Sequence, residues 1–591
     1  MTGMSPSLAP NGSAGSGSSH DGSAVPTRLG RLSGTEQRIW DAFPLGEPVD
    51  LRTGDPARDD PAEAAHWSAD RTVRGEVLAA LLLGARPAAP GAVAAVRLVG
   101  ARISGDLRID HGLVSALLHL RGCRVDGRID LDGATTGAID LRGSRLTRIS
   151  AYGAVVKGQL DLSDTVITGL ADGPGRGLSA VHGDGARIEG GLFASRAQVT
   201  GSFCLINAQV GGQLTLVDAR LFNTSADGKS FNGGGIRIGR SLLAQGLWAK
   251  GELRLPGAHI GSSLVLNGAR LDGLGGVALH ADDLLVASEA TFRTHSRGRS
   301  RRAFTAVGTV RLPWSRFGND LDLRGARLTP SADQPALEAE RILVEGSLRL
   351  GGGFRTDGEI RLTAARITSH LDLTGMSSPD ALLTLYTACA EGGIQEDAAS
   401  WPSRLNLDGF TYGGFTAYRE ASARLALMRR QVRRNDETRS GAYRAQPYEQ
   451  LASYYRSLGE DGEARTVLLA KQRALRSKLP WWRRVPGRVL DALVGYGYRP
   501  LRAIGWAAAL LTASSVYFSR VRPDHVASDD HSVFNPVLYS ADHLVPVIHF
   551  GQPDVWQYHG VPAVVTVLLT VLGWTLGIAI AAAASRTLTR N

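Results

Sequence analysis

The sequence contains little cysteine. Its three cysteines, Cys123, Cys204 and Cys389, are scattered and form no Cys-x-x-Cys pair. This spacing argues against a disulfide framework and against a structural zinc site. Because Cys123 and Cys204 fall inside the repeats described below, we predict that they are small buried thiols.

The sequence also lacks the short motifs of nucleotide-dependent and hydrolytic enzymes. Gly-x-Gly-x-x-Gly, Gly-x-Ser-x-Gly and His-Glu-x-x-His are all absent, so the usual dinucleotide site, nucleophile elbow and zinc-protease helix are not indicated. Gly228-Lys229-Ser230 is similar to the end of a phosphate-binding loop, but position 223 is Asn where that loop requires Gly. We therefore predict no catalytic, cofactor-binding or metal-binding residue, and no cofactor.

No apolar run near the N-terminus is long enough for a signal peptide. Residues 1–33 are rich in Ser, Gly and Pro, which predicts a disordered tail and a chain that is not exported by the usual route. The net charge of +10 is modest for 591 residues. Because much of it is local, we interpret it as charge for a membrane surface and predict no nucleic-acid partner.

The sequence does contain a repeated phrase between residues 96 and 375. Its clearest copies are Leu253-x-Leu255-x-x-Ala258-x-Ile260 and Leu264-x-Leu266-x-x-Ala269-x-Leu271, and each apolar position of the second lies eleven residues after its counterpart. Ile103 and Val125 are twenty-two residues apart. This regular spacing indicates an internal repeat.

Apolar residues two positions apart share one face of an extended segment, and no helix keeps an apolar face at this spacing. We predict a mainly β fold, a right-handed pentapeptide-like β-solenoid with half-repeats of eleven residues. Its coils should stack at about 4.8 Å, so that roughly ten coils form a rod on the order of 50 Å long. Glycine, 72 residues of 591, suits a chain that turns at every corner.

Insertions interrupt the repeats near residues 169–184, 222–236, 272–317 and 329–345. The longest carries a basic run, residues 293–302, which could bind the phosphates of lipid or nucleic acid. We favour a solvated loop, because no aromatic platform is interleaved with the basic residues.

Helical patterns flank the repeats. A helix near 62–83 is expected to cap the first coil. Helices are predicted over 418–434, 447–458 and 460–479, and the last two resemble a tetratricopeptide-type hairpin. The predicted domains are a disordered tail (1–33), a helical cap (34–95), the β-solenoid (96–415), a helical hairpin module (416–480), a basic juxtamembrane segment (481–503), a first transmembrane helix (504–519), an outer loop (520–560), a second transmembrane helix (561–584) and a tail (585–591).

Two apolar segments near the C-terminus predict a membrane anchor. The second has no charged residue over 561–584 and is long enough to cross about 30 Å of hydrocarbon. The first is shorter and depends on snorkelling by the arginines that flank it. A small-residue stripe, Gly573, Gly577 and Ala581, is expected to pack helix on helix, and homo-oligomerisation through the spans is an open alternative.

Charge predicts the orientation of the two spans. Nine Lys or Arg residues but one Asp lie between 471 and 502, whereas two Arg and five Asp lie between 520 and 560. By the positive-inside rule both termini and the solenoid are cytoplasmic, in a two-span protein of the cell membrane. Membrane lipid is then one partner, contacted through an interface anchor consisting of Trp481, Trp482, Arg483, Arg484, Arg499 and Arg502.

Several segments resemble a family of membrane proteins from high-GC Gram-positive bacteria that are often labelled "membrane-associated oxidoreductase". They are Thr35-Glu-Gln-Arg-Ile-Trp-Asp-Ala-Phe43, Val49-Asp-Leu-Arg52, Trp67-Ser-Ala-Asp-Arg-Thr-Val-Arg74, Gly495-Tyr-Gly-Tyr-Arg-Pro500 and Phe534-Asn-Pro-x-Leu-Tyr-Ser540. The resemblance covers nearly everything after residue 33. It implies a pentapeptide-repeat-like solenoid with a two-span end, and its label implies redox chemistry, for which no residue carries across.

Three functions are open at this point. The first is a membrane-anchored scaffold that is not an enzyme and binds a protein partner on a solenoid face. The second is an oxidoreductase, as the family label implies, with a cofactor site of unrecognised type. The third is a channel-like oligomer, in which residues 534–551 form a re-entrant loop, although no Thr-Val-Gly-Tyr-Gly filter is present.

Overall fold

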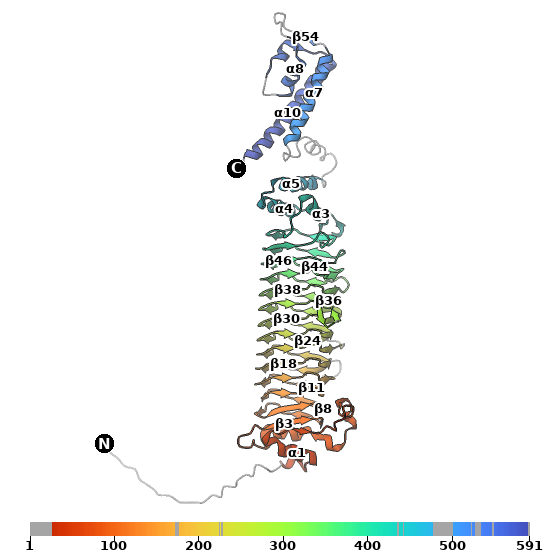
Figure 1. Cartoon of the computed structure of the whole chain (residues 1–591), viewed down its shortest axis with the longest axis vertical. Coiled ribbons are helices and arrows are strands. Elements are labelled where there is room, and N and C mark those ends of the chain that lie inside the picture. The colour runs from red at the N-terminus through yellow and green to blue at the C-terminus, as the bar shows by residue number, and fades with distance from the viewer. Residues whose placement is uncertain are drawn as a thin grey trace, which may run out of the picture. The chain divides into compact units, whose positions relative to one another are not determined.

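The computed structural model describes residues 26–171, 177–223, 225, 228–298, 300–433, 436–440, 443–476, 500–521, 523–525, 533–545 and 549–588. The chain divides into two compact units, Met1–Ser403 and Arg404–Asn591. The first unit is a stack of short parallel strands, seen side-on in Figure 1 from β3 to β46. The predicted β-solenoid is therefore confirmed as an architecture of stacked coils.

Each coil passes through four faces, numbered here in chain order. Face 1 carries fourteen parallel strands, whereas the sequence predicted roughly ten coils. Its strands are β1 (Val49–Asp50), β3 (Ala95–Val99), β7 (Leu117–Arg121), β10 (Ile139–Asp140), β13 (Leu160–Asp161), β18 (Leu192–Phe193), β22 (Leu214–Thr215), β26 (Leu242–Leu243), β30 (Leu264–Val265), β33 (Ala290–Thr291), β38 (Leu321–Asp322), β42 (Leu348–Arg349), β46 (His370–Asp372) and β49 (Gly393–Gln395).

Faces 2 and 3 follow face 1. Face 2 consists of β2 (Thr72–Arg74), β4 (Arg102–Ser104), β8 (Arg124–Asp130), β11 (Arg145–Ser150), β14 (Val166–Ile167), β19 (Gln198–Thr200), β23 (Arg220–Phe222), β27 (Trp248–Lys250), β31 (Arg270–His280), β36 (Thr305–Arg311), β39 (Arg327–Thr329) and β43 (Arg355–Thr356). Strands β8, β11, β31 and β36 continue into face 3, whose other strands are β5 (Leu107–Arg108), β16 (Leu178–His182), β20 (Ser202–Cys204), β24 (Lys229–Asn232), β28 (Glu252–Arg254), β40 (Leu337–Glu338), β44 (Glu359–Arg361) and β47 (Leu382–Thr384).

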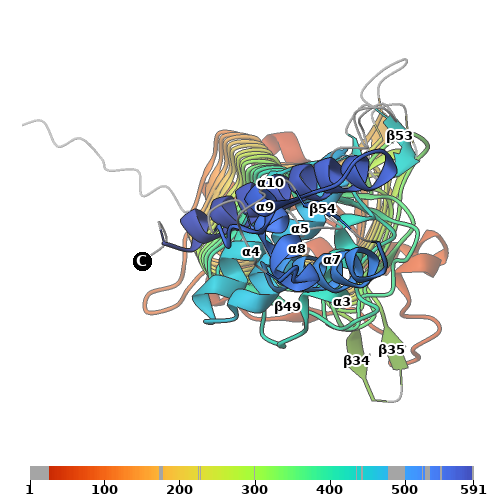
Figure 2. The ribbon, with the colours of Figure 1, turned by 90° about the horizontal axis from the view of Figure 1, so that it is seen from above.

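Face 4 completes each coil. It consists of β6 (Leu113–Val114), β9 (Thr135–Thr136), β12 (Val155–Val156), β17 (Arg187–Ile188), β21 (Gln209–Val210), β25 (Arg237–Ile238), β29 (His259–Ile260), β32 (Leu285–Val286), β37 (Arg316–Phe317), β41 (Leu343–Val344), β45 (Arg366–Ile367) and β48 (Cys389–Ala390). Two hairpins leave this plan: β15 (Leu170–Ala171), which pairs with β16, and the pair β34 (His295–Arg297) and β35 (Ser300–Arg302). Figure 2, which looks down the axis along which the coils stack, shows the β34–β35 hairpin projecting from the stack.

Aliphatic columns run through the middle of the solenoid. Leu242 pairs with Leu264, twenty-two residues on, and Ile103 pairs with Val125 in the same way, so the predicted coil length is confirmed. Leu192, Leu214, Leu242 and Leu264 are at most 2% exposed, and burial of each contributes about 2 kcal/mol before entropy is counted. Glycine is required where coils meet at the corner between faces 4 and 1, since a Cβ on Gly239 would lie 2.3 Å from the carbonyl oxygen of Gly211.

The N-terminal cap differs from the single helix predicted over 62–83. That range contains a 3-10 helix (Pro61–His66), another (Ala69–Arg71), strand β2, helix α2 (Gly75–Ala80) and a π-type turn (Leu81–Ala85). The helix is interrupted because Val73 pairs with Ile103 and so belongs to face 2. Helix α1 (Gly34–Ala42) begins at a capping box made by Ser33 and Glu36.

The second unit begins with β50 (Arg404–Asn406) and β51 (Thr411–Tyr412), followed by helices. Helix α3 spans Ala421–Met428, so the predicted helix 418–434 is too long, because residues from Val432 enter the antiparallel pair β52 (Val432–Arg433) and β53 (Asp436–Ser440). Helices α4 (Gln446–Ser457) and α5 (Asp461–Arg476) pack together as predicted.

In the first unit, a short 3-10 helix (Thr27–Leu29) and another at Phe43–Leu45 complete the elements of the N-terminal part.

The C-terminal part contains α7 (Pro500–Arg520), β54 (Asp524–His525), α8 (Pro536–Leu544), α9 (Gln552–Val555), β55 (Trp556–Gln557) and α10 (Val561–Leu588). Phe518, Tyr539, Leu544, Tyr558 and Leu569 form the buried cluster that joins α7, α8 and α10. Within the described residues, the stretch Val561–Ile578 of α10 is the one helix whose length and apolar composition suit a membrane crossing. The first predicted span lies in α7, whose arginines and small polar residues reduce its hydropathy.

A candidate anion-binding groove on face 2

The outward-facing side chains of face 2 form a basic column. The first residues of successive strands are in register, in the order Gln198, Arg220, Trp248, Arg270, Thr305 and Arg327. The following residue of each strand, such as Leu221 or Leu271, is buried in the solenoid core. Side chains alternate along a strand, so burial of the second residue directs the first outward.

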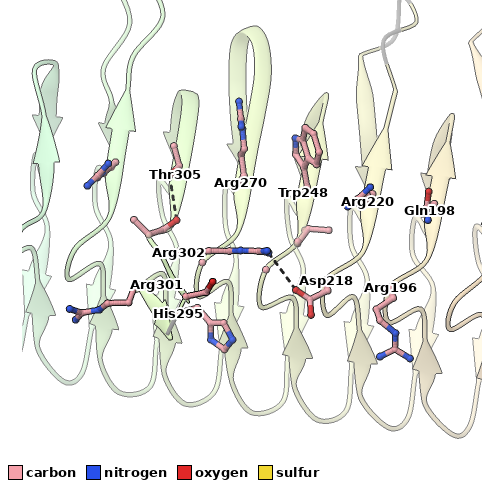
Figure 3. Close-up of a pocket in the computed structure, with 16 residues that line it drawn as sticks. Arg196, Gln198, Asp218, Arg220, Trp248, Arg270, His295, Arg301, Arg302 and Thr305 are labelled. Carbon is pink, nitrogen blue, oxygen red and sulfur yellow. Dashed lines mark hydrogen bonds and ion pairs between the residues drawn. The ribbon is translucent and has the colours of Figure 1, made fainter. Parts of the chain in front are cut away.

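Trp248 lies between two arginines of the neighbouring coils. The guanidinium carbons of Arg220 and Arg270 are 5.8 Å and 5.6 Å from the centroid of the Trp248 ring, a range in which cation–π attraction operates. Phe222 meets the indole edge-on at 5.0 Å between centroids. Figure 3 shows Arg220, Trp248 and Arg270 on successive coils.

The β34–β35 hairpin forms one wall of this region. It arises at the corner between faces 1 and 2, and His295 is in register with Arg302 across it. The hairpin packs closely against Gly268, since a Cβ on Gly268 would lie 2.6 Å from the Cβ of His295. Arg302 is directed back toward the coils and lies 3.9 Å from Asp218, as the dashed line in Figure 3 indicates.

Together these elements enclose a groove of about 1060 Å³ with an excess of positive charge. One acidic residue, Asp218, lies among six arginines in its lining: Arg196, Arg220, Arg270, Arg301, Arg302 and Arg327. Arg196 pairs with Asp164 at 2.6 Å, and this hydrogen bond raises the pKa of Arg196. No described carboxylate lies within ion-pair distance of Arg220, Arg270, Arg301 or Arg327.

The sequence did not predict this groove, although it singled out the basic run 293–302 that forms the hairpin. The run contains no aromatic residue of its own, and the aromatic platform comes from Trp248 on another coil. The signal was present in the repeat, because Trp248 and Arg270 are one coil length of twenty-two residues apart. Arg220 and Trp248 are further apart in sequence because an insertion separates their strands.

The membrane residues singled out in the sequence are placed only in part. Trp481, Trp482, Arg483, Arg484 and Arg499 lie outside the described residues, and Arg502 is in α7. Gly573 is buried, and a Cβ there would lie 2.4 Å from the carbonyl oxygen of Leu544, so Gly573 contacts the end of α8. Gly577 is partly exposed on α10, and Ala581 lies further along the same helix.

The thiols and acidic groups also have defined surroundings. None of the three cysteines, all of which the structure describes, forms a disulfide; Cys123 is fully buried as predicted, whereas Cys204 and Cys389 are partly exposed. Burial raises the pKa of the Cys123 thiol to about 12, which keeps it protonated and unreactive. Over the described ranges, no group of three or more His, Cys, Asp or Glu side chains is arranged to hold a metal ion. Comparison of the chain with protein-family models, with curated proteins and with solved structures gives no match.

Proposed function

We propose that this protein is a membrane-anchored scaffold whose solenoid binds an acidic surface of a protein partner through face 4. The observation that carries the proposal is the regularity of this face. From β6 to β48 its strands are all parallel and in register, and each contributes two residues. Such an extended, repetitive surface is typical of solenoids that bind proteins.

The insertions leave face 4 free. Four of the excursions, near residues 168–177, 223–228, 273–276 and 330–336, lie between faces 2 and 3, and the β34–β35 hairpin lies between faces 1 and 2. The outward column of face 4 includes exposed Arg187, Arg237, Arg316 and Arg366. Neutral residues and His259 lie between these arginines in the column, so the column carries positive charge that complements acidic side chains.

Membrane attachment is the second element of the proposal. Helix α10 supports one span, and we assign α7 as the second because it forms a helix over the predicted segment and packs against α10 through the aromatic cluster. The basic residues between 471 and 502 favour a cytoplasmic solenoid and cytoplasmic termini. We also propose that the solenoid winds in the right-handed sense and that the chain belongs to the membrane-protein family that its sequence resembles.

Site-specific photo-crosslinking in intact cells tests the partner surface. A photoreactive residue at Gln209 or His259 on face 4 should give a discrete protein adduct, and the same residue at Val265 on face 1 should not. The double change Arg237→Glu and Arg316→Glu should abolish the adduct, while Arg237→Lys and Arg316→Lys should retain it. Equal adducts from both faces, or an adduct that survives charge reversal, would refute the assignment of face 4.

A second experiment tests the topology. The substitution Ser528→Cys places a thiol in the predicted outer loop, and Ser225→Cys places one in the solenoid. A membrane-impermeant maleimide added to intact cells should modify the first variant and leave the second unmodified until the membrane is permeabilised. The opposite pattern would contradict a cytoplasmic solenoid.

A further inference from the structure

We propose that the groove between the Trp248 column and the β34–β35 hairpin binds a ligand that carries at least two phosphate groups. The ligand is a phosphorylated small molecule or the diphosphate-bearing headgroup of a lipid, since the chemistry that recognises both is the same. This inference is independent of the partner on face 4, because faces 2 and 4 are separate surfaces of each coil.

The first support is the absence of internal compensation. Arg220, Arg270 and Arg327 occupy one column, and no described carboxylate lies within ion-pair distance of any of them. The one acidic residue in the lining, Asp218, lies 3.9 Å from Arg302 of the hairpin. Like charges held in a groove repel one another, and a bound anion removes that repulsion.

The second support is the chemistry of the cations. The positively charged residues of the lining are all arginines, with no lysine. The guanidinium fork donates two parallel hydrogen bonds to phosphate oxygens, which a lysine ammonium does not. The cation–π contacts with Trp248 orient Arg220 and Arg270 before any ligand binds, so less side-chain entropy is lost on binding.

The spacing indicates more than one phosphate. The guanidinium carbons of Arg220 and Arg270 lie on coils on either side of Trp248 and are no more than about 11 Å apart, because they are 5.8 Å and 5.6 Å from one ring centroid. Because Arg220 and Arg270 are two strand spacings apart, about 10 Å along the stack, a chain of two or three phosphates reaches both guanidinium groups more readily than a single phosphate does. Trp248, 38% exposed, offers an apolar edge to the rest of the ligand.

The binding experiment uses the full chain in detergent, titrated with orthophosphate, inorganic triphosphate and ATP and followed by calorimetry. We expect triphosphate and ATP to bind at least tenfold more tightly than orthophosphate. A separate arm adds mixed micelles with and without cardiolipin, whose headgroup carries two phosphates. If the lipid competes with triphosphate, the membrane is the source of the ligand; if it does not, the ligand is a soluble compound, and either result supports a diphosphate site.

Matched variants separate the groove from general charge. Arg220→Gln with Arg270→Gln should weaken triphosphate binding at least tenfold. Arg145→Gln with Arg355→Gln removes the same charge from the same column outside the groove and should change affinity less than twofold. Three results would overturn the proposal. The two double variants could lose affinity equally, orthophosphate and triphosphate could bind with equal affinity, or triphosphate could fail to bind at millimolar concentration. Unaltered thermal unfolding of both variants establishes that they are folded.

Discussion

The N-terminal coils and the groove coils present arginines on the same repetitive scaffold, but the arginines have different surroundings. In the N-terminal coils, one carboxylate serves two arginines. Asp126 bonds to Arg102 and Arg124 at 2.7 Å and 2.9 Å, and Asp140 bonds to Arg121 and Arg142 at 2.6 Å and 2.8 Å. In the groove coils, four of the lining arginines have no such partner among the described residues.

This comparison shows that an arginine ladder on a solenoid does not by itself indicate a binding site. Stacking brings equivalent positions of successive coils close together, so a column of arginines needs acidic neighbours to limit repulsion. Where acidic residues are present, the arginines cross-link the coils. Where acidic residues are missing, the positive charge of the column is not neutralised within the chain and can attract an anionic ligand.

The largest expected effect on stability is at Asp140, which is 4% exposed. Burial raises the pKa of Asp140, but hydrogen bonds from Arg142 and Arg121 lower it further, to about 2. Since this pKa is below the unfolded value of about 3.9, the carboxylate stabilises the fold by about 2 kcal/mol above pH 4, and the contribution disappears as the pH falls toward 2. Asp140→Asn should lower the urea midpoint of the β signal at pH 7, and the difference from the unmodified chain should vanish near pH 2. A difference that is constant with pH would contradict this account.

The next prediction concerns a substitution that removes the shared carboxylate from a pair of arginines in the N-terminal coils. Asp126→Asn leaves Arg102 and Arg124 without their shared carboxylate and should destabilise the adjacent coils by about 1 kcal/mol, since these pairs are partly exposed. Hydrogen exchange of amides in β4 and β8 should accelerate. Added triphosphate should slow that exchange again in the variant but not in the unmodified chain; the same response in both would argue against the comparison.

A change of similar size tests the hairpin. Gly257 and Gly268 have nearly equal positive φ values of +63° and +66°, but a Cβ on Gly257 meets nothing within 4 Å, whereas on Gly268 it meets His295. Alanine at either position costs about 1 kcal/mol through its backbone conformation. Gly268→Ala should in addition displace the hairpin, accelerate hydrogen exchange in β34 and β35, and weaken triphosphate binding. Gly257→Ala should leave both measurements unchanged.

The smallest effect on stability comes from adding a carboxylate to the groove. Thr305 is in register between Arg270 and Arg327, so Thr305→Glu places one carboxylate between these two arginines. We expect about 0.5 kcal/mol of stabilisation, as for exposed ion pairs, together with a clear loss of triphosphate affinity. Thr305→Gln controls for side-chain size and should retain binding. Retained binding in the Glu variant would show that bare charge is not what distinguishes the groove.

The solenoid could be predicted because its cause is local and repeated. Each coil must bury an aliphatic pair such as Leu264 and Leu266, and the spacing of these pairs is visible in the sequence. The number of coils was underestimated in part because β1 and β2, which add one coil, precede the regular repeats: Val49 pairs with Leu98 and Val73 with Ile103 across long loops. Tertiary pairing of this kind overrides helical periodicity, which is why the predicted 62–83 helix is broken.

The groove was harder to predict because its residues are distributed over several coils. Only the register of Arg220, Trp248 and Arg270 places them side by side, and an insertion before β24 hides part of that register. In the second unit, α4 and α5 follow their periodic pattern. The sequence could not show that Gly573 contacts α8. A stripe of small residues indicates that another helix packs closely, but it does not show whether that helix is α8 or the other predicted span.

The cap at the start of the solenoid has one further consequence. Helix α1 contacts β1 and β2, α2 contacts β5, and the turn Leu81–Ala85 contacts β6, so elements from the cap lie against the first strand of every face. A chain that began after residue 94 would expose four unpaired strand edges in one plane. Such an end is a template onto which the exposed edge of another copy can add, and self-association of the truncated chain would follow.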